Sequence, residues 1–95
     1  MSAYLIADIQ ITDPQAFEEY RRLVPAIIEA YGGRYLVRGG EARLLEGDAA
    51  PGRTIVLEFA DMEHLNAFYS SADYEPLKAL RMRASTGRLF SVAGV

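Results

Sequence analysis

The stretch from Tyr4 to Ile11 constrains the fold most, because its residues alternate between two kinds of surface. One parity is wholly apolar and consists of Leu5, Ala7, Ile9 and Ile11. The other parity mixes apolar and polar side chains and consists of Tyr4, Ile6, Asp8 and Gln10. Successive residues of a β-strand point to opposite faces of a sheet, so the stretch predicts a strand with one apolar face and one mixed face.

A helix is predicted next, beginning at Asp13 and Pro14, because Asp is a good N-cap and Pro is tolerated at the first helical position. Its apolar stripe has helical spacing and comprises Phe17, Tyr20, Leu23, Val24, Ile27 and Ile28. Pro25 is expected to kink the helix rather than end it, since the stripe continues past it. Gly32 and Gly33 predict its C-terminal end.

Two more strands are predicted before the next helix. The first is expected as one long strand in two parts, residues 34–37 and 42–46, with a bulge at Gly39 and Gly40. Residues 47–52 are dense in turn formers and predict a hairpin loop. Residues 54–59 alternate again and predict the following strand.

The last third of the chain predicts a split helix and a final strand. Asp61 is expected to cap a helix over residues 62–69, and after an interruption a further helix is expected over residues 74–84. Gly87 is expected to end that helix, and residues 88–95 are expected to form the last strand.

The element order predicts an α+β domain over residues 1–95, with the ferredoxin-like βαββαβ arrangement, an antiparallel sheet and a split second helix. Both helical layers would cover the same sheet face. The other face would expose a largely apolar group comprising Tyr4, Ile6, Val56, Phe90 and Val92. Such patches usually mark an interface, and a two-fold related copy is the commonest cover, so we expect a homodimer. The alternative is a monomer that tolerates a mildly apolar sheet face.

Composition and motifs exclude several classes of function. The chain has no cysteine, which rules out disulfides, thiolate nucleophiles and cysteine metal sites. A net charge of −3 with scattered arginines argues against nucleic acid as a partner. No signal peptide or membrane-spanning run is evident, so we expect a soluble, cytoplasmic protein without a membrane partner. No phosphate loop, nucleophile elbow or metal-spaced cluster is present, so neither a cofactor nor a metal is predicted.

Several segments together resemble one family of small bacterial proteins. They are residues 35–41, 45–48, 55–59, 67–71 and 74 with 77–81. The family is the domain of unknown function 1330 (DUF1330) family, a branch of the dimeric α+β barrel superfamily, and the resemblance covers nearly the whole chain. It implies a ferredoxin-like protomer whose sheet pairs with a second sheet to form a barrel. It implies no established activity. The wider superfamily includes heme-degrading and quinol-type monooxygenases, muconolactone isomerase and stress-responsive proteins, which is analogy at the level of fold.

His64 is the first candidate for chemistry, because it is the only histidine. It lies in the first turn of a predicted helix, where the helix dipole disfavours a positive charge, so a neutral imidazole able to shuttle a proton is expected. A surface histidine without a function is the alternative.

Asp8, Arg38 and Glu58 form a second candidate set. Asp8 and Glu58 have the parity of the mixed sheet face, and Arg38 joins them if the bulge at Gly39 and Gly40 resets the alternation. If the three converge, they orient a small carbonyl or carboxylate compound with a carboxylate as base, or they form a structural salt bridge across a dimer.

Tyr69, Tyr74 and Arg81 form a third set. Tyr74 and Arg81 share one face of the last predicted helix, and Tyr69 lies just before the interruption. Two phenols and a guanidinium would suit an anionic or aromatic ligand between the sheet and the helices. Alternatively the tyrosines are core residues with their hydroxyls at the rim, and Arg81 caps backbone carbonyls or pairs with Glu75 or Glu63.

The sequence therefore predicts a small barrel that binds a small organic molecule, without assigning a catalytic residue. It could be a cofactor-free isomerase or monooxygenase. The alternative is a non-enzymatic binding or stress-associated dimer whose charged residues are structural, and heme degradation is a distant third.

Overall fold

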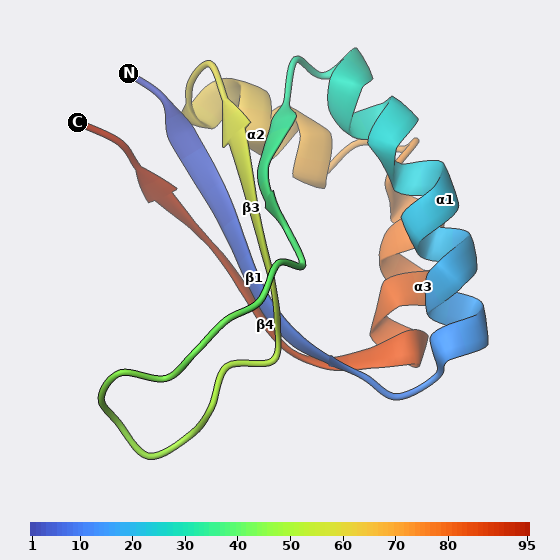
Figure 1. The fold of residues 1–95 in the computed structure, drawn as a ribbon. Helices are drawn as coiled ribbons and strands as arrows, with labels where there is room; N and C mark the ends of the chain where they lie inside the picture. Colours follow the sequence, from blue (N-terminus) through green and yellow to red (C-terminus); the bar gives the residue numbers. More distant parts are fainter.

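The computed structural model describes residues 1–95 and confirms the ferredoxin-like arrangement with a split second helix. The elements are β1 (Ala3–Ile11), α1 (Pro14–Ala30), β2 (Arg34–Arg38), β3 (Arg53–Phe59), α2 (Met62–Tyr69), α3 (Glu75–Ala84) and β4 (Ser85–Ala93). The four strands form one antiparallel sheet in the order β2-β3-β1-β4, and the helices lie on one side of it (Figure 1).

The core lies between the sheet and the helices, as the alternation in β1 predicts. Four residues of β1 that share one parity are buried, and the last of that parity, Ile11, is exposed at the end of the strand. Other core residues come from every helix and from β3. The core comprises Ala3, Leu5, Ala7, Ile9, Phe17, Tyr20, Val24, Ile28, Leu57, Phe59, Leu65, Phe68, Tyr74, Leu77 and Ala84.

The predicted helix starts are confirmed at α1 and α2. The Asp13 carboxylate accepts a hydrogen bond from the backbone N–H of Ala16 at 3.1 Å, and the Asp61 carboxylate accepts one from the N–H of His64 at 2.8 Å. These bonds satisfy N–H groups that have no partner within the helix. Helix α1 also continues through Pro25, and Gly32 follows its end with φ +80°.

The predicted long strand with a bulge at Gly39 and Gly40 is wrong. Strand β2 ends at Arg38, its register shifts between Tyr35 and Val37, and residues 42–46 pair with no strand. The physical reason is that pairing with β3 stops at Arg38 opposite Ile55, close to the start of β3 at Arg53, so little of β3 is left for residues 42–46 to pair with. The segment between the two strands is a long exposed loop that extends from the body of the protein (Figure 1).

The boundary between α3 and β4 also differs from the prediction. Helix α3 ends at Ala84, and β4 begins at Ser85 because it pairs with β1 from Ser85 opposite Ile11 onward. Gly87 lies inside β4 with φ +133°, and a Cβ there would stand 2.3 Å from the backbone oxygen of Asp8. Glycine at this position therefore permits close strand approach rather than ending a helix.

The sheet face opposite the helices is open in the single chain. Its largest exposed apolar side chains are Val37, Phe90 and Val92, which are 38%, 42% and 43% exposed. None of the helices combines the length and the apolar composition that a bilayer-spanning segment requires.

Candidate functional site

Three polar side chains form a hydrogen-bonded cluster in the interior. The hydroxyls of Tyr20 and Tyr74 lie 2.8 Å apart, and Nε of Arg81 donates to the Tyr74 hydroxyl at 3.3 Å. We call this the tyrosine–arginine cluster. Helix α1 supplies Tyr20, and Tyr74 is the N-cap residue of α3. Arg81 lies seven residues further along, on the same face of that helix.

Arg81 is a buried cation without an acidic partner. It is only 7% exposed, and none of the ion pairs in the chain includes it. Burial lowers the pKa of its guanidinium, but the proximity and hydrogen bond of Tyr74 outweigh this effect and hold the pKa above its ordinary value. The cluster therefore carries a positive charge that no carboxylate of the chain compensates. Such a charge is costly to bury unless it is paired.

The cluster has more hydrogen-bond donors than acceptors to receive them. The bond between the two phenols uses one of their two O–H groups, whichever donates, and the Nη groups of Arg81 make no hydrogen bond within the chain. Burial raises the pKa of the Tyr20 hydroxyl, and the proximity of Tyr74 raises it further, so Tyr20 stays protonated. The arrangement therefore complements an oxygen anion.

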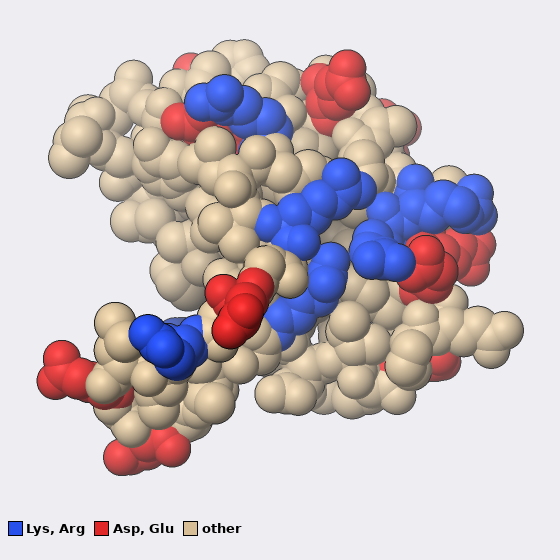
Figure 2. All heavy atoms as spheres, viewed as in Figure 1, with Lys and Arg blue, Asp and Glu red and all other residues tan.

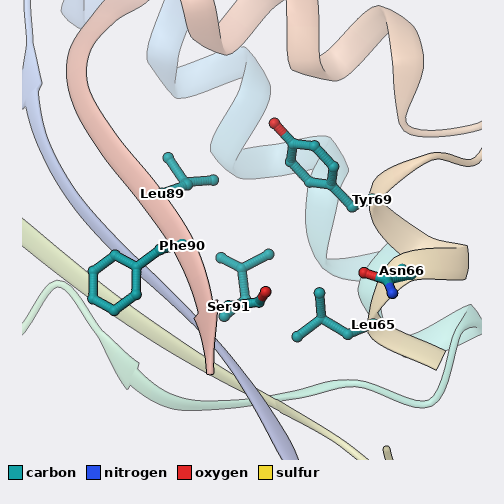
Figure 3. A pocket seen from close by; sticks show the side chains of 7 residues that line it. Leu65, Asn66, Tyr69, Leu89, Phe90 and Ser91 are labelled. Carbon is teal, nitrogen blue, oxygen red and sulfur yellow. The ribbon is translucent and has the colours of Figure 1, made fainter. Parts of the chain in front are cut away.

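Two adjoining hollows lie along β4, and the second of them reaches Arg81 of this cluster. The first is a groove of about 190 Å³ between α2 and β4, where Leu65, Asn66 and Tyr69 face Leu89 and Ser91. Figure 3 shows these side chains across the groove, while the ring of Phe90 points to the other side of β4.

The second hollow continues this groove along β4 and has a volume of about 210 Å³. Tyr69 and Leu89 line both parts, and Arg81 lines the second part together with Ser85 and Thr86. We call the two parts together the β4 groove. Arg81 also lines an enclosed, otherwise mostly apolar cavity of about 30 Å³ beside Tyr20 and Tyr74, which has room for about one water molecule. A ligand of more than a few atoms therefore fits the β4 groove and not the enclosed cavity.

The third predicted set is brought together. The ring centroids of Tyr69 and Tyr74 lie 5.8 Å apart, and Arg81 bonds Tyr74 rather than Glu75 or Glu63. Sequence reasoning missed Tyr20 as a polar partner. Its position in the apolar stripe of α1 marked it as core, and only the contact between α1 and α3 reveals the hydroxyl pair.

The second predicted set is not brought together. Asp8 lies opposite Thr54 and Glu58 opposite Tyr4, so the two carboxylates stand four positions apart along β1 on the open face. Arg38 lies opposite Ile55, which has the parity of the helix-covered face. The Asp8 carboxylate accepts from the N–H of Gly52 at 2.7 Å.

Glu58 instead forms its own small network at the edge of the open face. It accepts from Nε of Arg34 at 2.7 Å and from the Tyr4 hydroxyl at 3.3 Å. The hydrogen bond from Arg34 is the main cause that lowers the pKa of Glu58.

His64 is exposed and lies outside the cluster. Its Nδ1 stands 2.6 Å from the Asp61 carboxylate, and this hydrogen bond raises the pKa of the imidazole. The Asp61 carboxylate therefore favours the protonated imidazole and acts against the helix dipole on which the expectation of a neutral ring rested. No group of three His, Cys, Asp or Glu side chains is arranged to hold a metal.

Comparisons with known proteins agree with this fold. The family model described as "Domain of unknown function (DUF1330)" matches residues 2–95. No curated protein matches the sequence. A protein of unknown function from Rhodopseudomonas palustris has a similar structure, with a TM-score of 0.78 and 16% identity over 99% of this chain and 82% of that chain.

Two other solved structures are also similar in fold. SnoaB, a cofactor-independent oxygenase from Streptomyces nogalater, has a TM-score of 0.67 and 13% identity over 99% of this chain and 93% of that chain. A conserved protein from Methanosarcina mazei Go1 has a TM-score of 0.59 and 18% identity over 99% of this chain and 90% of that chain.

Proposed function

The chain belongs to the DUF1330 family, and from the site it carries we propose that it binds a small organic anion in the β4 groove. The anionic oxygen of this ligand contacts Arg81, and its apolar body lies against Leu65 and Leu89. The observation that supports this most is the burial of Arg81 without any carboxylate partner. A bound anion would supply the missing charge, and a guanidinium matches a carboxylate or enolate oxygen well.

The similarity in fold to a cofactor-independent oxygenase supports one reaction class, the oxygenation of an organic substrate without a cofactor. The cluster would stabilise an enolate, and the β4 groove is lined by no carboxylate or imidazole that could act as a base. The absence of a base in the groove favours an oxygenase whose substrate ionises readily. It argues against an isomerase, which must abstract a proton from its substrate. A methylene group of such an enol would react with O₂ to give a carbonyl and water, with all electrons taken from the substrate. Oxygen uptake with a cyclic 1,3-diketone tests this step; if only binding is seen, the non-enzymatic alternative holds.

Binding itself is tested by calorimetric titration with benzoate and with benzamide, which has the same shape but no charge. We expect benzoate to bind more tightly than benzamide. Arg81→Met should weaken benzoate binding by about tenfold or more, the value of one charge-assisted contact. Arg83→Met is the matched control, because Arg83 is exposed on the same helix. This variant should bind benzoate as tightly as the unaltered protein does.

Stability separates this proposal from a structural role. Removing an unpaired buried charge is expected to leave the unfolding temperature unchanged or raise it, whereas a structural role for Arg81 predicts a clear loss. If Arg81→Met does not fold, Arg81→Lys keeps the charge but loses the planar fork, and should still weaken benzoate binding. Unaltered benzoate affinity in the folded variant would refute the proposal.

We further propose that the open sheet face pairs with a second copy of the chain. The exposed Val37, Phe90 and Val92 support this, since covering apolar area contributes roughly 25 cal/mol per Å². The cytoplasmic location and the absence of nucleic-acid partners stay predictions from the sequence.

A further inference from the structure

A second group of positive charge lies on the opposite side of the molecule from the β4 groove, where α1 meets the end of β2 and the start of β3. It consists of Arg21, Arg22, Arg38 and Arg53, which we call the arginine mouth. Figure 2 shows blue side chains gathered in this region, although the whole chain has a net charge of −3. The only acidic residue that lines it is Glu18, which pairs with Arg21.

Arg53 is held in place without any acidic partner. Its Nε is fully buried and has no hydrogen-bond partner. Its guanidinium fills the space beside Gly39, where a Cβ would stand 2.3 Å from Nη1. The ring centroid of Phe17 lies 5.9 Å from its Cζ, and none of the ion pairs in the chain includes Arg53. The chain therefore leaves this guanidinium without a neutralising group, and because Nε is buried, an anion from outside would contact the terminal Nη groups.

Arg38 is oriented in a similar way. Its Cζ lies 4.4 Å from the ring centroid of Tyr35, and it makes no ion pair. Stacking on an aromatic ring fixes the guanidinium plane while leaving its N–H groups available. On the solvent side of Arg38 lies an open hollow of about 300 Å³, which is also lined by Arg21 and Arg22.

We propose that the arginine mouth binds the phosphate group of a small organic phosphate monoester. Several guanidinium groups with one acidic neighbour match a dianion better than a monocarboxylate, because each fork can contact a separate pair of oxygens. The partly buried ring of Tyr35 lines the same place and provides an apolar surface for the ester group. This site does not depend on Arg81 or on the anion proposed for the β4 groove.

The test is titration of the whole protein with phenyl phosphate, followed by NMR or calorimetry at pH 7.5. Comparison ligands are methyl phenyl phosphate, a singly charged diester, and a short single-stranded RNA. We expect phenyl phosphate to bind at least about tenfold more tightly than the diester. Its affinity should fall as the pH drops below about 6, where the phosphate gains a proton.

Variants locate the site. Arg53→Met and Arg38→Met should each weaken phenyl phosphate binding about tenfold or more, whereas Arg43→Met, which removes an exposed loop arginine, should not. Arg81→Met should also leave phenyl phosphate binding unchanged, which separates this proposal from the one for the β4 groove. If Arg53→Met does not fold, Arg53→Lys keeps the charge, loses the fork and should show the same weakening. Equal losses in Arg43→Met, no loss in the folded Arg53 variant, or tighter binding of the RNA would each overturn the proposal.

Discussion

Gly39 shows how one backbone position controls a side chain. It adopts φ +74°, and the absence of a Cβ makes room for the guanidinium of Arg53. Gly39→Ala should therefore lower the free energy of unfolding by about 1 kcal/mol or more through backbone strain, and should also displace Arg53. Gly40→Ala is the matched control, because its φ is not positive and nothing lies within 4 Å of a Cβ there. Chemical denaturation of both variants checks this, and equal stability of the two would contradict it.

His64 provides a pH-dependent prediction. Its folded-state pKa is raised by Asp61, so the interaction stabilises the protein fully below the ordinary histidine value of about 6.5 and is lost as the pH rises through the raised value. An NMR titration of the imidazole should give a pKa above 6.5 in the unaltered protein. In Asp61→Asn the pKa should fall back toward the ordinary value. An unchanged pKa in this variant would show that the side-chain pair is not formed in solution.

Residue types alone predicted part of the site. Tyr69, Tyr74 and Arg81 were identified because helical spacing relates residues within one helix. Tyr20 could not be identified as their partner, since its contact with Tyr74 spans two helices 54 positions apart in sequence. Parity likewise assigned Asp8 and Glu58 to the open face, but it gave no measure of their separation along the strand.

At the scale of elements, local chemistry predicted the starts of helices better than the ends of strands. Asp13 and Asp61 cap their helices through side-chain hydrogen bonds that depend only on neighbouring residues. The ends of β2 and β4 depend on where β3 and β1 offer partners, which is a long-range property. For this reason the bulge was expected at Gly39 and Gly40, although the register shift lies before them.

The split between α2 and α3 has a consequence for the β4 groove. The hydroxyl of Ser71 accepts from the N–H of Tyr74 at 3.1 Å and donates to the carbonyl of Phe68 at 2.8 Å, which joins the end of α2 to the start of α3. Tyr69 at the end of one helix and Arg81 in the other therefore line the same groove. The sequence predicted this break but not its internal bonding.

At the scale of the whole molecule, the open sheet face determines the proposed assembly. Phe90→Lys with Val92→Lys should convert a dimer into a monomer, because two charges would be buried in the interface. Met82→Lys is the control, since Met82 is 59% exposed on α3 and lies on the helix side. Sedimentation equilibrium measures the mass of each variant. A monomeric unaltered protein at micromolar concentration would contradict the proposed pairing.

Arg81 is proposed to bind an anion that comes from outside the chain. The most direct measurement is a crystal structure of the protein grown with benzoate. The proposal predicts density for the ligand in the β4 groove, with a carboxylate oxygen within hydrogen-bond distance of an Arg81 Nη atom and the ring against Leu89. A β4 groove that stays empty at saturating benzoate, with Arg81 still bonded only to Tyr74, would contradict it.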